Sequence, residues 1–192
     1  MKTLLYIVFT FHFLFILLTA ILPLLVYRIT GNPASSGYVL ATFMFALLGS
    51  RVYLLKYDVE EVRLLKVGLL FYSSGFGLLL IGSTTLFVFF IGALLFGIAV
   101  GIIAPALITL VTSSGNQTQK MVGIYNSLMG IASAIGPFAG LSLFYKVDTV
   151  DLYLILFLTS LTIFIPSLLI EMEQEREKTN ANPFRKEIFS LE

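Results

Sequence analysis

Long stretches without charged residues constrain this chain most, because they decide the solvent in which it folds. A helix that crosses a membrane needs about 20 mostly apolar residues. Such stretches cover most of the sequence, and only one of them is interrupted by a charge, Arg51. They run over Thr3–Tyr27, Ser36–Leu55, Val67–Gln119, Met121–Tyr145 and Leu152–Ile170. Only 12% of the 192 residues are charged, against about 25% in soluble domains, so the sequence predicts a membrane protein.

The stretch over Val67–Gln119 is far too long for a single span. It contains Gly82-Ser83-Thr84-Thr85, and glycine followed by small hydroxyl residues favours a turn. Two spans joined at this turn raise the total to six. We therefore expect an all-α membrane protein in which residues 1–170 form a bundle of six transmembrane helices.

The distribution of basic residues predicts the orientation of this bundle. With six crossings, all of the twelve Lys and Arg residues except Arg28 and Lys146 fall on one side. Cytoplasmic segments carry the excess of Lys and Arg, so both termini are expected in the cytoplasm and the bundle in the plasma (inner) membrane. We interpret the polar residues 171–192 as a cytoplasmic, linker-like tail, of which Glu171 to Lys178 prolong the sixth helix.

Composition excludes several classes of function. The chain has no cysteine and a net charge of +1, which leaves no thiolate metal site and no basic field for nucleic acid. No Asp, Glu or Lys lies inside a predicted span, so paired-carboxylate catalysis has no basis. We expect a protein without enzymatic activity, cofactor or metal.

Small residues recur at intervals of four in the fourth and fifth spans. Helices in lipid associate closely where small side chains let their backbones approach. The two runs indicate tight helix contacts, either as plain packing or as part of a moving surface. They are Ala93, Gly97 and Gly101, and Ala132, Gly136 and Gly140.

Two prolines occupy similar positions in the first and fourth spans. Pro23 and Pro105 each lie about twenty residues into their span. Equivalent first and fourth spans indicate two three-helix repeats, and a repeat with an odd number of spans inserts its second copy upside down. Inverted repeats of this kind are frequent in secondary transporters.

His12 is the single histidine and lies inside the first span. An ionisable group at this depth is expected to face other helices and is a functional candidate by default. Two interpretations stay open: a contact to substrate or proton, since histidine titrates near physiological pH, or a neutral, hydrogen-bonded packing residue. Tyrosines lie mostly at the ends of spans, as interfacial rings do; Tyr125 is one of them, and only Tyr72 lies well inside a span.

The fifth span carries a small and polar stripe at helical spacing. It could line a water-filled pathway or form a tight helix contact, because a proline in it frees a carbonyl that only protein or water can satisfy. Thr19 and Thr109 are lesser pathway candidates, since a hydroxyl can bond its own helix. The stripe consists of Asn126, Gly130, Ser133, Pro137 and Gly140.

These features resemble the amino-terminal half of a major facilitator superfamily transporter. The run from Gly130 to Gly140, with Gly136 and Pro137, looks like the antiporter motif of the fifth span in the efflux branches of that family. The final glycine of the family motif is Leu141 here. In the fourth span, the arginine expected four residues before Gly97 is Ala93.

The segment after the second span is similar to the family's signature between spans 2 and 3. Arg51, Asp58, Arg63 and Lys66 correspond to its charged residues, while Glu61 stands where the family has a glycine. The resemblance implies that charge pairing here holds the cytoplasmic side closed in one conformation. The alternative is a solvated charged loop that only orients the protein.

The resemblance implies alternating-access transport of a small molecule, in the efflux direction. Members normally have twelve spans and a substrate cavity between two six-span halves, with spans 1, 4 and 5 facing it. This chain corresponds to one half, so we expect either a truncated product or a half-transporter that pairs with a second half, as a separate chain or a second copy. The alternative function is a non-transporting multi-span scaffold or assembly protein.

Overall fold

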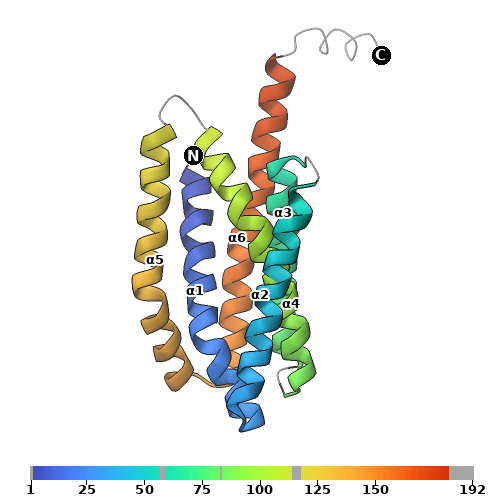
Figure 1. The fold of residues 1–192 in the computed structure, drawn as a ribbon. Helices are drawn as coiled ribbons and strands as arrows, with labels where there is room; N and C mark the ends of the chain where they lie inside the picture. Colours follow the sequence, from blue (N-terminus) through green and yellow to red (C-terminus); the bar gives the residue numbers. More distant parts are fainter. Residues whose placement is uncertain (1, 57–58, 83, 114–117, 182–192) are drawn as a thin grey trace, which may run out of the picture.

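The chain folds into six helices in the computed structural model, which describes residues 2–56, 59–82, 84–113 and 118–181 (Figure 1). All six described helices are long and apolar enough to cross a membrane, which confirms the predicted all-α membrane fold. They are α1 (Lys2–Thr30), α2 (Pro33–Leu54), α3 (Glu61–Gly82), α4 (Leu86–Ser113), α5 (Thr118–Lys146) and α6 (Thr149–Ala181).

The breaks between helices follow local sequence signals. α3 ends at Gly82 and α4 begins at Leu86, so the long apolar stretch divides at the predicted turn. Between α1 and α2, Gly31 has a φ of 63°, which suits glycine because it lacks a Cβ. Asn32 then caps α2, since its side-chain oxygen accepts a hydrogen bond from the Ala34 N–H at 2.9 Å.

α6 extends well beyond the apolar part of its sequence. It continues to Ala181 and includes residues 171–178, where the sequence predicts a prolonged helix. In Figure 1 this end of α6 projects past the other helices. The rest of the tail, residues 182–192, lies outside the described residues.

The helices pack as two inverted three-helix repeats, α1–α3 and α4–α6. The most extensive contacts join α3 to α4, α2 to α4, α1 to α5 and α3 to α6. The repeats match α1 with α4 and α2 with α5. Under this matching, the contact of α2 with α4 is equivalent to the contact of α5 with α1. Figure 1 shows α5 beside α1 at one edge of the bundle and α2, α3 and α4 grouped at the other.

Glycines on α4 bring its backbone against α2. A Cβ added at Gly97 would overlap the carbonyl oxygen of Phe43, and one at Gly101 would overlap the Ser50 hydroxyl and lie 2.7 Å from the Leu47 carbonyl oxygen. No side chain fits at either position without displacing α2. The small residues of the fourth span therefore form a tight helix contact.

Glycines on α5 serve the α1–α5 pair in a similar way. A Cβ at Gly136 would lie 2.9 Å from Cγ2 of Ile16, and one at Gly140 would lie 3.0 Å from Cγ2 of Ile21. Both glycines are buried. Each helix pair thus has a close contact built on glycine.

Arg28 joins three helices at the carboxyl end of α1. Its guanidinium carbon lies 4.1 Å from the ring centroid of Phe144 on α5, a cation–π arrangement. Its Nη1 also donates a hydrogen bond of 3.2 Å to Oγ1 of Thr149 on α6. The side chain is therefore a structural contact as well as an interfacial charge.

Candidate functional site

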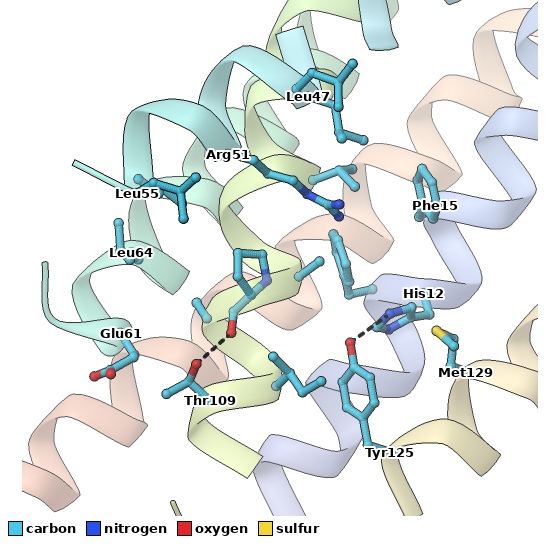
Figure 2. Close-up of a pocket in the computed structure, with 18 of the residues that line it drawn as sticks. His12, Phe15, Leu47, Arg51, Leu55, Glu61, Leu64, Thr109, Tyr125 and Met129 are labelled. Atoms are coloured by element: carbon cyan, nitrogen blue, oxygen red, sulfur yellow. Dashed lines mark hydrogen bonds between the residues drawn. The ribbon is translucent and has the colours of Figure 1, made fainter. Parts of the chain in front are cut away.

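A cavity of about 920 Å³ lies between the α1–α5 and α2–α4 pairs (Figure 2). Phe11, Phe15 and Ile16 line it from α1, and Leu47 and Val100 line it from α2 and α4. Most of this wall is apolar. The polar groups that reach the cavity are few, so each can be placed individually.

His12 and Tyr125 form a hydrogen-bonded pair across α1 and α5 at this cavity. Nδ1 of His12 lies 2.8 Å from the Val8 carbonyl oxygen, so this nitrogen must carry a proton. In the neutral imidazole Nε2 is then the acceptor, and the Tyr125 hydroxyl, 3.2 Å away, donates to it. Both side chains are buried and both line the cavity. The hydrogen bond therefore ties the two helices together at the cavity wall.

Two charged residues line the same cavity at the ends of α2 and α3. Arg51 lies in the last turn of α2 and Glu61 in the first turn of α3. Figure 2 shows the Arg51 guanidinium pointing inward, toward the side on which Phe15 and His12 lie. The cavity thus combines apolar walls with opposite charges near its rim.

The two threonine candidates bond their own helices. Thr109 lines the cavity, and its hydroxyl donates to the Pro105 carbonyl oxygen at 3.0 Å (Figure 2). The hydroxyl of Thr19 donates to the Ile16 carbonyl oxygen at 2.9 Å, and Thr19 is not among the residues that line the cavity. The local bonds reduce the need of either hydroxyl for another partner.

The stripe on α5 divides into an open part and a covered part. Asn126, Gly130 and Ser133 are exposed, and of these Ser133 lines the cavity. Gly140 is instead buried against α1, where a Cβ added to it would lie 3.0 Å from Cγ2 of Ile21. The stripe therefore has no single environment, and the two roles that the sequence leaves open for it stay predictions.

Pro137 changes the hydrogen bonding beside the cavity. A proline has no N–H to offer the carbonyl four residues earlier, which here belongs to Ser133. The Ser133 carbonyl therefore lacks its usual helical donor on the part of α5 that faces the cavity. It is a hydrogen-bond acceptor that water or a solute can use.

The charged residues between α2 and α3 do not form one cluster in the described part of the chain. Arg51 lies at the cavity, whereas Arg63 lines a separate groove between α2, α3 and α4. Lys66 is half-buried on α3. Asp58 lies outside the described residues, so the charge pairing expected of it stays a prediction.

Sequence reasoning did not single out Tyr125 or Glu61 as residues of the cavity. The sequence indicates Tyr125 only as an interfacial ring, although it lies at the same level of the bundle as His12. Since a buried imidazole needs a partner, a tyrosine at matching depth was the available signal. Glu61 drew attention only because it replaces a glycine of the family signature.

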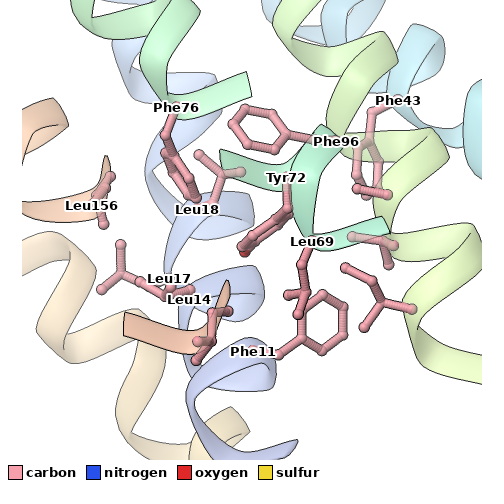
Figure 3. Packing of buried hydrophobic residues seen from close by; sticks show 14 of the residues in the cluster. Phe11, Leu14, Leu17, Leu18, Phe43, Leu69, Tyr72, Phe76, Phe96 and Leu156 are labelled. Carbon is pink, nitrogen blue, oxygen red and sulfur yellow. The ribbon is translucent and has the colours of Figure 1, made fainter. Parts of the chain in front are cut away.

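Tyr72, the tyrosine inside a span, lies in the apolar core and not at the cavity (Figure 3). Its ring centroid lies 5.5 Å from that of Phe11, 5.1 Å from that of Phe76 and 5.6 Å from that of Phe96. Its hydroxyl has no hydrogen-bond partner among the described residues. Tyr72 therefore packs α3 against α1 and α4.

Comparison with known proteins shows which family and which solved structure this chain resembles. The family sequence model described as Major Facilitator Superfamily matches residues 3–191 of this chain. A crystal structure of a variant of the peptide transporter POT in complex with sulfate superposes with a TM-score of 0.70 at 14% sequence identity. The match covers 99% of this chain and 44% of the POT chain, so this chain spans less than half the length of that structure. No curated protein matches the sequence. The chain belongs to the Major Facilitator Superfamily.

Proposed function

We propose that this chain forms one half of a transporter that moves a small molecule across the membrane by alternating access. The observation that carries the proposal is the cavity of about 920 Å³ between the two glycine-packed helix pairs. It is large enough for a small solute, since ligand pockets commonly measure about 300–1,000 Å³. Several lining side chains, among them Leu48, Val52 and Met129, are exposed, so the cavity is open on one side.

A second six-helix bundle is proposed to cover this open side. α2 and α5 are the least buried of the described spans. They present large apolar side chains, including Phe45 on α2 and Phe138 on α5. Lipid covers part of such a surface, and a companion bundle covers the part beside the cavity. The companion is a separate chain or a second copy of this one.

The substrate is proposed to be a lipophilic small molecule with a polar or charged group. Phe11, Phe15 and Met129 offer apolar contact, while Arg51 and the His12–Tyr125 pair offer polar contact at the same cavity. Ser133 and Thr109 also face this space. Asn126, exposed on α5, is proposed to face the pathway beyond the cavity, and Thr19 is proposed to adjoin it from α1.

His12 is proposed to respond to proton binding. Proton uptake at Nε2 turns an acceptor into a donor, so the Tyr125 hydroxyl has to rotate and present its own acceptor oxygen. The polar character of the cavity wall then changes without any movement of the backbone. Efflux is the direction proposed from the run Gly130 to Gly140, with both termini in the cytoplasm and the protein in the plasma membrane.

Export assays in cells that also supply the companion bundle test the proposal. Gly136→Leu or Pro137→Leu is expected to abolish export, because leucine at position 136 meets α1 and the loss of Pro137 restores the hydrogen bond to the Ser133 carbonyl. Gly123→Ala is the matched control, since a Cβ there meets nothing within 4 Å. Normal export by both α5 variants contradicts the proposal.

A second variant separates loss of transport from loss of folding. Ser133→Leu places an apolar side chain at an exposed cavity position, so the bundle should fold while the cavity is partly filled. We expect normal amounts in the membrane fraction and at least a tenfold loss of export. Full export by a folded Ser133→Leu protein shows that solutes do not use this cavity. If the unmodified protein exports nothing and stays monomeric on native gels, it fits a scaffold instead.

A further inference from the structure

A second hollow adjoins the cavity described above, and the two share Leu54, Val59 and Leu64 in their walls. This groove has a volume of about 610 Å³ and is formed by α2, α3 and α4. Apolar side chains line most of it, among them Phe71 on α3 and Leu94, Ile98 and Ile102 on α4. Among its described lining residues, Arg63 is the one with a formal charge.

The groove lies at the periphery of the bundle. α1 and α5 line the cavity described above, but they contribute no residue to this groove. Its α4 residues Leu94 and Ile98 precede those that α4 gives to the cavity, such as Thr109. Leu94 and Val67 are 44% and 40% exposed. In a membrane-spanning bundle these side chains meet hydrocarbon, so lipid has direct access to the groove.

The groove runs from the membrane surface toward the middle of the bilayer. Arg63 lies in the first turn of α3 and is exposed, at the end where the chain is expected to meet the cytoplasm. Phe71 lies eight residues further along the same helix, about 12 Å deeper at 1.5 Å per residue. The groove thus has a positive charge at its mouth and apolar walls below.

Gly49 leaves the groove open in the second half of α2. It lines the groove, and a Cβ placed on it meets no atom within 4 Å. This differs from Gly97 and Gly101, which the α2–α4 contact requires. The protein itself thus does not need glycine at position 49 for helix packing.

We propose that the groove binds a phospholipid with an anionic headgroup. An acyl chain lies along Phe71, Leu94 and Ile98, and the headgroup phosphate contacts the Arg63 guanidinium. Charge complementarity selects this occupant, because basic pockets between transmembrane helices on the cytoplasmic side recognise anionic lipid headgroups. A neutral lipid fills the same apolar walls but gains less from Arg63. This proposal does not depend on transport activity.

The absence of tryptophan makes the proposal testable with single tryptophan reporters. The full chain carrying Leu94→Trp is reconstituted in vesicles that contain increasing fractions of brominated phosphatidylglycerol or brominated phosphatidylcholine. Bromine on the acyl chains quenches tryptophan fluorescence on contact. We expect quenching by the anionic lipid at about a fivefold lower mole fraction, which corresponds to one basic residue near the headgroups.

Four variants assign the effect to the groove. Ile81→Trp, at a position 88% exposed and outside the groove, should be quenched equally by both lipids. Arg63→Gln should abolish the preference at position 94. Gly49→Leu fills the groove and should reduce quenching there by either lipid, whereas Gly37→Leu, on the same helix with free space around it, should not. Circular dichroism checks that each variant is helical.

The outcomes decide the proposal directly. Equal quenching of Leu94→Trp by the two lipids overturns it. A preference of the same size at position 81 also overturns it, because the preference then belongs to the whole lipid shell. If the preference survives Arg63→Gln, the anionic headgroup does not sit where we place it.

Discussion

The α2–α4 and α1–α5 helix pairs occupy equivalent places in the two repeats, yet glycine supports them differently. In the first pair the glycines lie on α4 and face the backbone of α2 at Phe43 and Leu47. In the second pair they lie on α5 and face mainly side chains of α1, those of Ile16 and Ile21. The repeat therefore preserves which helices meet, but not which helix carries the small residues.

The pairs also differ in their polar contacts. α1 and α5 share the buried hydrogen bond between His12 and Tyr125. At the α2–α4 contact, the Ser50 hydroxyl donates to the Leu47 carbonyl of its own helix at 2.9 Å. The α2–α4 contact thus depends on steric fit, whereas the α1–α5 contact combines a looser fit with a directional bond.

Gly101→Ala should have the largest effect on stability. Its Cβ would meet the Ser50 hydroxyl and the Leu47 carbonyl, and a carbonyl cannot move without the helix. We expect a loss of about 3 kcal/mol or more in the free energy of unfolding. Unfolding of the purified protein by SDS, followed by circular dichroism, measures this loss. Ser50→Ala should restore only part of it, and complete restoration shows that the α2 backbone is not in the way.

Gly136→Ala should cost less, about 1–2 kcal/mol. The nearest atoms belong to the Ile16 side chain, which can adjust. Ile16→Leu removes the methyl group on Cβ and should recover most of the loss. Gly130→Ala is the control, because nothing lies within 4 Å of its Cβ, and it should not destabilise the protein. A cost equal to that of Gly101→Ala contradicts the distinction between backbone and side-chain contacts.

Tyr125→Phe should destabilise the protein by about 1 kcal/mol, because it leaves Nε2 of His12 without a donor. A double-mutant cycle with His12→Phe measures the coupling directly. Hydrogen bonds between membrane helices average about 0.6 kcal/mol in such cycles, and we expect a similar value. Coupling indistinguishable from zero shows that the pair makes no net hydrogen bond in the membrane.

Ser36→Ala should have the smallest effect, about 0.5 kcal/mol. Ser36 on α2 donates a hydrogen bond of 2.8 Å to the Pro23 carbonyl of α1, and so it links one helix pair to the other. The SDS unfolding midpoint should fall slightly, and Ser36→Thr should preserve it if the hydroxyl is what matters. A loss as large as that of Gly101→Ala contradicts our view that the main contacts lie within the pairs.

The sequence predicts the architecture well because the membrane imposes simple rules. Span length, the break at Gly82 and the close contacts at Gly97 and Gly136 follow from apolar length and residue size. The α1–α5 hydrogen bond did not follow, because His12 and Tyr125 are 113 residues apart. Only the packing of α5 against α1 brings the two side chains together.

The composition of the cavity was harder to predict. Arg51 was expected in a closing interaction of the cytoplasmic loop, but the last turn of α2 directs it to the cavity wall. Glu61 joins it because few residues separate α2 from α3. The different environments of Gly130 and Gly140 depend on where α5 contacts α1, which helical spacing alone does not reveal.

The glycines at the contacts within the two helix pairs determine how the bundle can deform. The two helices of a pair cannot slide past each other without steric overlap, and they cannot separate without leaving voids. Each helix pair therefore moves as a rigid unit. The cavity lies where the two helix pairs meet. Widening the cavity requires one helix pair to tilt relative to the other. A solute bound in the cavity contacts both pairs at once.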